Sequence, residues 1–288
     1  MAQDGIGASM KRREDARFLK GIGKYTDDMT FPRQTYCYIL RSQIAHGKIN
    51  KIDTSAAAKM PGVVAILTSK DFEGVGGVPC GWLVTGKDGP MKEPKHPILA
   101  EGKVRHVGDP IVAVIAETLN QAKDAAEKID IDLTELPAVV DMKKALKGGG
   151  TPVHDEATTN LCFDWDFPGD SSEVDAIIAS AHHVTKLDLV NNRLVANAME
   201  PRAAIGVYDP SMDEHTLVTT SQNPHVIRLL MGAFVLGIPE HKLRVYAPDV
   251  GGGFGSKIYH YAEEALVTWA SKKIGRPIKW TAERLESF

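Results

Sequence analysis

Two runs of consecutive apolar residues in the first half of the chain predict buried strands. Residues 63–68 and 111–116 are almost entirely apolar, as strands covered on both faces usually are. Within 118–129 the apolar positions recur at helical spacing, which predicts an amphipathic helix capped by Thr118. Residues 129–133 then alternate between apolar and polar, as in a half-buried strand. This mixture of strands and helices indicates an α+β fold.

The second half of the chain mixes strands and helices in the same way. Asn223-Pro224 is a typical helix start, because proline is well tolerated at the first helical position, and Gly237 is a typical helix end. We expect strands at 184–190, 204–208, 216–220 and 243–247, and helices at 172–181, 225–236 and 259–274.

A glycine-rich stretch at 147–152 separates the two halves, as a flexible linker would. We therefore place a domain boundary there. The predicted organisation is an N-terminal extension at 1–17, a first domain at 18–147 and a second domain at 148–288.

The composition is that of an ordinary globular protein, with 43% hydrophobic and 25% charged residues in a chain of 288. A net charge of −3 gives no electrostatic reason to expect nucleic acid as a partner. No stretch approaches the ~18 apolar residues of a membrane span. The N-terminus lacks the pattern of a secretory signal, so we expect a cytoplasmic protein.

Cysteine, histidine and paired glutamate residues suggest no independent metal or acid/base site. Cys37, Cys80 and Cys162 lie far apart, so we expect free buried thiols and no iron–sulfur cluster on this chain. The ten histidines form no metal-binding motif, and we expect them at the surface or at helix caps. Glu263 and Glu264 fall on the flank of a predicted helix, which does not favour a paired acid/base site.

The strongest candidate site is the glycine-rich segment 249–257, Asp-Val-Gly-Gly-Gly-Phe-Gly-Ser-Lys, between a predicted strand and a predicted helix. Glycines there allow the backbone to approach a ligand and present free N–H groups. A Walker phosphate loop does not fit, because Ser256 precedes Lys257 and Ile258 follows it. A Rossmann fingerprint that begins at Gly251 ends on Ser256, where glycine is required. A tight structural turn is the remaining alternative.

The amino-acid sequence of this segment resembles the pterin-side loop of molybdenum hydroxylases, the superfamily of xanthine dehydrogenase, aldehyde oxidase and aerobic carbon monoxide dehydrogenase. The large chain of the last of these is the member that it looks most like. Other segments resemble the same superfamily in the same order: 12–19, 23–28, 41–47, 107–114, 191–193 and 199–203. The resemblance covers nearly the whole chain. It implies an α/β hammerhead domain at 18–147 and the first, incomplete part of a molybdopterin-binding domain at 148–288.

The resemblance also implies which residues face the cofactor. Gln222 would hydrogen-bond a ligand of the metal, since an amide can donate without titrating. The glycines would present backbone amides and the phenylalanine would wall the site, while no side chain would bind the metal directly. The cofactor-binding residues expected on this basis are Gln222, Gly252, Gly253, Phe254 and Gly255.

Three further expectations concern catalysis. The general base of the family is expected beyond residue 288, so we assign no catalytic residue here and expect the isolated chain to be inactive. Glu200 and Arg202 are as compatible with a structural ion pair as with a role in the site. Ile258 stands where purine hydroxylases of the family tend to carry glutamate, which favours a carbon monoxide dehydrogenase-like or aldehyde-oxidising relative.

The function implied by the resemblance is that of the molybdopterin-binding subunit, in its N-terminal part, of a molybdenum-dependent oxidoreductase. The cofactor would be molybdenum on molybdopterin, in the cytosine dinucleotide form. FAD would lie on a medium partner subunit and [2Fe–2S] clusters on a small one, and the remainder of the large subunit would be a further partner. The substrate would be a small molecule. The alternative is a truncated or split-gene chain that acts only as a structural or assembly subunit.

Overall fold

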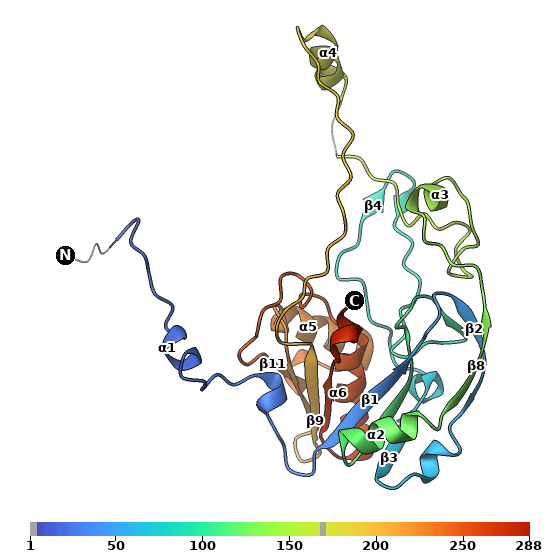
Figure 1. Cartoon of the computed structure of the whole chain (residues 1–288), viewed down its shortest axis with the longest axis vertical. Coiled ribbons are helices and arrows are strands. Elements are labelled where there is room, and N and C mark those ends of the chain that lie inside the picture. Colours follow the sequence, from blue (N-terminus) through green and yellow to red (C-terminus); the bar gives the residue numbers. More distant parts are fainter. Residues whose placement is uncertain (1–4, 168–170) are drawn as a thin grey trace.

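The computed structural model describes residues 5–167 and 171–288, and its centre is a seven-stranded mixed sheet (Figure 1). Its strands, in spatial order, are β11 (Leu243–Tyr246), β10 (Glu214–Thr219), β9 (Ala203–Asp209), β12 (Ile278–Thr281), β1 (Thr35–Arg41), β7 (Pro110–Ala116) and β3 (Val63–Leu67). The sheet joins both halves of the chain, because β1 pairs in parallel with β12. The predicted α+β class is confirmed.

Two smaller sheets and several short helices surround this sheet. The smaller sheets contain β6 (Lys103–Val104), β2 (Gly47–Asp53) and β8 (Asp130–Glu135), and β4 (Thr85–Gly86) with β5 (Gly89–Pro90). The α-helices are α1 (Asp15–Phe18), α2 (Leu119–Ala126), α3 (Met142–Leu146), α4 (Ser172–Ser180), α5 (Pro224–Leu230) and α6 (Ala262–Ile274). A π-helical turn, η4 (Met231–Leu236), continues α5, and 3-10 turns lie at η1 (Thr26–Asp28), η2 (Ala57–Lys59), η3 (Ser69–Phe72), η5 (Glu240–Lys242) and η6 (Arg284–Ser287).

Strand β7 is buried along its whole length because it lies between two hydrophobic cores. Ala113 and Ile115 point into the core that α6 covers, whereas Val112 and Val114 point into the core that α2 covers. Successive side chains of a strand face opposite sides of the sheet, so a strand covered on both sides is apolar throughout. This burial explains the continuous apolar run in the sequence.

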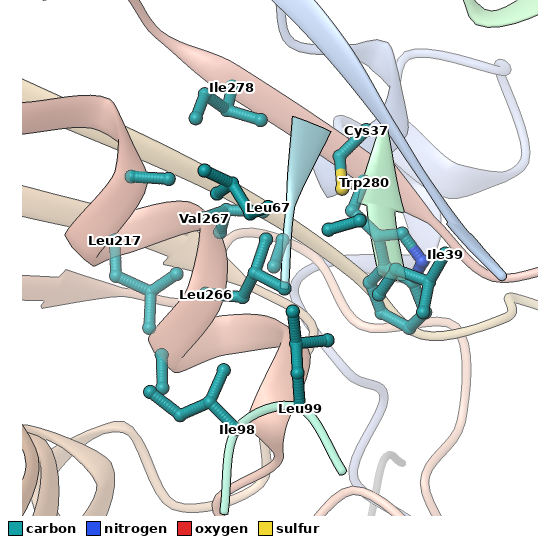
Figure 2. Close-up of a cluster of buried hydrophobic side chains, with 14 of the residues drawn as sticks. Cys37, Ile39, Leu67, Ile98, Leu99, Leu217, Leu266, Val267, Ile278 and Trp280 are labelled. Atoms are coloured by element: carbon teal, nitrogen blue, oxygen red, sulfur yellow. The ribbon is translucent and has the colours of Figure 1, made fainter. Parts of the chain in front are cut away.

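Helix α6 packs across the sheet and forms the centre of the larger core (Figure 2). Leu266 and Val267 lie in the same cluster as Leu67 of β3 and Leu217 of β10. The helix comes so close to β9 that a Cβ atom on Gly206 would lie 2.1 Å from the carbonyl oxygen of Val267. Glycine at 206 therefore sets the distance between the helix and the sheet.

This close approach predicts that Gly206→Ala destabilises the protein. A methyl group there meets the backbone of α6, which cannot rotate away, so we expect a loss of about 2–3 kcal/mol in the free energy of unfolding, measured by urea denaturation. Gly81→Ala is the matched control, because the nearest atom to its Cβ would be 3.8 Å away. We expect the control to change stability by less than about 0.5 kcal/mol. Equal losses in the two variants would contradict the role of Gly206.

The predicted strand at 184–190 is wrong. These residues form no strand, and Leu187 and Leu189 are exposed. The segment belongs to an arm that leaves the body and carries α4 at its far end (Figure 1). A strand requires a neighbour for its backbone hydrogen bonds, and the described part of the chain places no strand beside this segment.

Two further expectations about polar residues are corrected by the structure. Only Cys37 is a buried thiol, whereas Cys80 and Cys162 are exposed. The histidines are not confined to the surface, because the side chains of His46, His215 and His260 are buried in the interior. Burial of these groups follows from long-range packing, which local patterns do not report.

Candidate functional site

The glycine-rich segment connects β11 to α6 and folds into a loop that only glycine-rich sequences tolerate. Gly252 and Gly255 have positive φ angles of +92° and +93°. Phe254 lies between them with a φ of 49°, and its side chain is 76% exposed. A non-glycine residue in the left-handed region is uncommon. The loop therefore holds a phenylalanine ring out into solvent on a constrained backbone.

Gln222 follows β10 and is hydrogen-bonded to this loop through both its backbone and its side chain. Its backbone N–H donates to the carbonyl oxygen of Lys257 (2.8 Å). Its side-chain Oε1 accepts from the backbone N–H groups of Gly255 (3.0 Å) and Lys257 (3.3 Å). Two donors at this atom identify it as the amide oxygen. The Nε2 group of Gln222 is therefore left to donate elsewhere.

The backbone amides of the loop divide into bonded and free groups. The N–H of Gly255 is taken by Gln222, so it is not free for a ligand in this arrangement. Among the described residues, the N–H groups of Gly252, Gly253 and Phe254 have no hydrogen-bond acceptor. The loop thus presents three consecutive free donors beside the Gln222 amide.

Two of the glycines are required by close packing on either side of the loop. A Cβ atom at Gly253 would lie 2.3 Å from Oε1 of Gln222. A Cβ atom at Gly251 would lie 2.5 Å from the Cβ of Glu200. The loop is therefore sandwiched between Gln222 and Glu200. A side chain at position 251 would meet the Cβ atom of Glu200, whereas one at position 253 would displace the Gln222 side chain from its bonds to the loop.

Glu200 forms an ion pair with Lys257 and not with Arg202. The structural ion pair between Glu200 and Arg202, one of the two possibilities left open by the sequence, is therefore wrong. The Nζ of Lys257 lies 2.9 Å from Oε2 of Glu200 and 2.8 Å from its backbone oxygen. The same Oε2 accepts from the N–H of Gly251 (2.7 Å). Burial lowers the pKa of Lys257, and the carboxylate of Glu200 opposes that shift. Sequence reasoning missed this pair because its partners are 57 residues apart.

Arg202 instead binds Glu263, the second residue of α6. Glu263 is buried between Arg202 (3.1 Å) and Arg41 (2.7 Å), and Arg41 also binds Glu286. Burial raises the pKa of Glu263, but the two guanidinium groups more than offset this and hold it at about 2. Glu263 is therefore a buried structural carboxylate held by two arginines from other parts of the chain.

The N-terminal segment is bound to the start of the loop. Arg17 forms a two-point ion pair with Asp249, and the backbone N–H of Lys24 donates to the same carboxylate (2.8 Å). The hydrogen bonds from Arg17 and from the Lys24 amide lower the pKa of Asp249 to about 2. Arg17 was expected to end a separate extension, and no local pattern in the sequence pairs it with a residue 232 positions away.

A cavity of about 810 Å³ lies against one end of the loop. Its walls include Ser256 and Lys257 of the loop and the ion pairs of Arg41, Arg202 and Glu263. None of the five predicted cofactor-binding residues lines it. The structure thus brings Gln222 together with Gly252, Gly253, Phe254 and Gly255, but places them outside this cavity.

Residues 5–167 and 171–288 contain neither a metal-binding cluster nor a helix that could span a membrane. Within these ranges, no group of three or more histidine, cysteine, aspartate or glutamate side chains could hold a metal ion. No helix in the same ranges is long and apolar enough to cross a membrane.

Comparison with known proteins identifies relatives along nearly the whole chain. Nicotine 6-hydroxylase large subunit from Paenarthrobacter nicotinovorans is 36% identical over 98% of this chain and 34% of its own length. Carbon monoxide dehydrogenase large chain from Hydrogenophaga pseudoflava is 33% identical over 96% of this chain and 35% of its own length. The crystal structure of quinoline 2-oxidoreductase from Pseudomonas putida 86 superposes with a TM-score of 0.84 at 32% identity, over 98% of this chain and 35% of that one.

The chain therefore spans about a third of the length of the curated relatives that it matches. Residues 20–137 match the family "aldehyde oxidase and xanthine dehydrogenase, a/b hammerhead domain". Residues 153–288 match the family "molybdopterin cofactor-binding domain". These matches confirm the resemblance seen in the sequence, and the chain belongs to the large-subunit family of the aldehyde oxidase and xanthine dehydrogenase type of molybdenum hydroxylases.

Proposed function

We propose that this chain forms part of the molybdopterin-binding subunit of an oxidoreductase that hydroxylates a small molecule with oxygen from water. The observation that carries the proposal is the geometry of Gln222 and the glycine loop. Oε1 of Gln222 is bonded to the loop, so its Nε2 is the group left to donate. The unbonded N–H groups of Gly252, Gly253 and Phe254 lie in the same loop.

This set of groups fits the cofactor of the family. Four donors lie in the loop or beside it, namely Nε2 of Gln222 and the N–H groups of Gly252, Gly253 and Phe254. The carboxylates at the loop are already paired, Asp249 with Arg17 and Glu200 with Lys257. Oxygen and sulfur atoms of a metal centre or its pterin accept hydrogen bonds from such groups. Molybdenum on molybdopterin, which we expect in the cytosine dinucleotide form, would supply the two-electron redox chemistry when bound.

The residues of the chain would hold and orient the ligand and would not bind the metal themselves. Gln222 would donate through Nε2, and the loop amides would donate beside it. Phe254, exposed on its constrained backbone, would cover one side of the bound group. Glu263 and Glu286 of the neighbouring cavity are paired with arginines, so we assign neither as a general base.

The proposed substrate class rests on the residue after Lys257 and on the names of the relatives. Ile258 directly follows Lys257 and offers no hydrogen bond to a purine. We therefore propose a carbon monoxide dehydrogenase-like or aldehyde-oxidising enzyme. Relatives named for nicotine and quinoline make a nitrogen heterocycle a further candidate.

Partner subunits would carry the remaining redox groups. The three cysteines of this chain are free thiols, so we propose that the [2Fe–2S] clusters lie on a small partner subunit. We also propose FAD on a medium partner subunit and a cytoplasmic location for the complex, as the family resemblance implies. Names such as "large subunit" and "large chain" among the relatives support a complex of several chains.

Elemental analysis of the native complex tests the proposal. The chain would be purified with its associated chains from its own host, and molybdenum would be measured against protein. We expect about one molybdenum per copy of this chain. A complex without molybdenum would overturn the proposal and favour the alternative, a structural or assembly subunit.

A further inference from the structure

The ion pair of Glu200 and Lys257 stands at the base of the glycine loop. The side chain of Lys257 is 1% exposed and that of Glu200 is 11% exposed. The ammonium group of Lys257 donates twice to Glu200, once to its carboxylate and once to its backbone oxygen. The pair therefore fixes both the side chain and the backbone of Glu200 relative to the end of the loop.

Each partner of this ion pair is also bonded to another part of the site. The carboxylate of Glu200 accepts from the N–H of Gly251, at the start of the loop. The backbone of Lys257 exchanges hydrogen bonds with Gln222 in both directions, through its N–H and its carbonyl oxygen. One connected set of bonds thus runs from Gly251 through Glu200 and Lys257 to Gln222 and Gly255.

Stability alone does not explain an ion pair in this position. Removing two charges from water is costly, and a pair of well-packed apolar residues is often as stable. Apolar side chains, however, could not accept a hydrogen bond from the N–H group of Gly251, as the carboxylate of Glu200 does. Oε1 of Glu200 is buried without a hydrogen-bond partner among the described residues, so Oε2 alone sets the orientation of the carboxylate.

We propose that the Glu200–Lys257 pair positions the glycine loop against Gln222, so that the Gln222 amide and the free N–H groups of Gly253 and Phe254 converge on one ligand. Both residues are positioning residues, because neither is expected to touch the ligand. The identity of that ligand rests on the proposed function. The positioning itself is a property of this chain and can be measured without a cofactor.

Amide hydrogen exchange of the chain carrying both E200Q and K257M tests the proposal directly. The double variant removes both charges and keeps similar volumes, whereas K257M alone leaves Glu200 buried and unpaired. We expect the amides of Gly255 and Lys257 to exchange about 10-fold faster or more, since loss of the pair releases the loop from Gln222. The amide of Gly255 donates to Gln222 and lies outside both replaced residues, so its exchange reports the position of the loop, and the amide of residue 257 is compared after correction for its new side chain.

A matched control removes an exposed ion pair elsewhere. D213N with K272M neutralises partners that are 62% and 51% exposed, and we expect no change in the exchange of the loop amides. Wild-type exchange at Gly255 and Lys257 in the E200Q/K257M variant would overturn the proposal. Accelerated exchange that is equal in β9 and β10 would also overturn it, because it would show general unfolding.

The purified complex separates this inference from the proposed function. We expect the E200Q/K257M complex to keep its molybdenum content and KM while kcat falls about 10-fold or more. If the wild-type complex contains no molybdenum, the proposed function fails, and the exchange measurement still decides the positioning role. If wild type contains molybdenum and the double variant keeps wild-type exchange and kcat, the positioning role fails and the proposed function stands.

Discussion

Replacing Gln222 by alanine is expected to reduce kcat of the assembled enzyme by about 100-fold or more, as the loss of a preorganised donor does in other active sites. The substitution removes the free Nε2 donor and the acceptor that binds the amides of Gly255 and Lys257. Gln222 is exposed, so we expect the melting temperature to change by only a few degrees. Steady-state kinetics and thermal unfolding of the same preparation measure both effects. Near-wild-type turnover would disprove the role of Gln222.

Gln222→Glu is the matched variant that separates its two roles. A carboxylate can still accept from the amides of Gly255 and Lys257, but it has no Nε2 to donate. If donation matters, this variant loses turnover as the alanine variant does. If turnover is retained in Gln222→Glu, the side chain serves only to anchor the loop.

The parts of the fold that could be predicted from sequence depend on local physics. The apolar run of β7 follows from burial on both faces of one strand. Helix α2 begins after Thr118, whose side chain accepts from the N–H of Gln121, and this cap was visible in the sequence. Gly237 and Gly275 end their helices in the left-handed conformation, which glycine adopts without strain.

The strand expected at 184–190 fails because alternation alone does not supply a neighbour. Its apolar side chains predict burial, and the structure instead leaves them exposed on an arm. A strand forms when a neighbouring backbone completes its hydrogen bonds, and the sequence of the segment alone does not show whether such a neighbour exists.

The sequence singles out the glycine loop and Gln222, which the structure brings together, but it does not reveal the ion pairs around them. That these residues bind a cofactor stays a prediction. The loop could be found because its glycines lie between a predicted strand and a predicted helix, and because segment 249–257 resembles a loop of the family. The partners of Glu200, Arg202 and Asp249 could not be found, since each is distant in sequence. Charges of either sign are numerous, and only the fold selects which of them meet.

Glu263→Gln is expected to be the most destabilising of the charge substitutions. It removes a carboxylate that is buried between Arg41 and Arg202, and it leaves Arg202 without a counter-charge. Breaking a buried ion pair in this way typically costs about 3–5 kcal/mol, which urea unfolding at pH 7 would measure. Glu240→Gln is the matched control, because its ion pair with Arg228 is over 40% exposed on both sides. We expect the control to lose less than about 1 kcal/mol.

The pH dependence of stability provides a second measurement of the same carboxylate. The pKa of Glu263 is about 2 in the folded protein and 4.5 in its ordinary state, so the unfolded chain takes up the proton first as pH falls. Its contribution is therefore present above pH 4.5 and is lost as pH falls from 4.5 toward 2. Glutamine cannot titrate, so the Glu263→Gln variant should lose stability less steeply than wild type across this range. Parallel curves for the two proteins between pH 5 and pH 3 would show that Glu263 is not held ionised by Arg41 and Arg202.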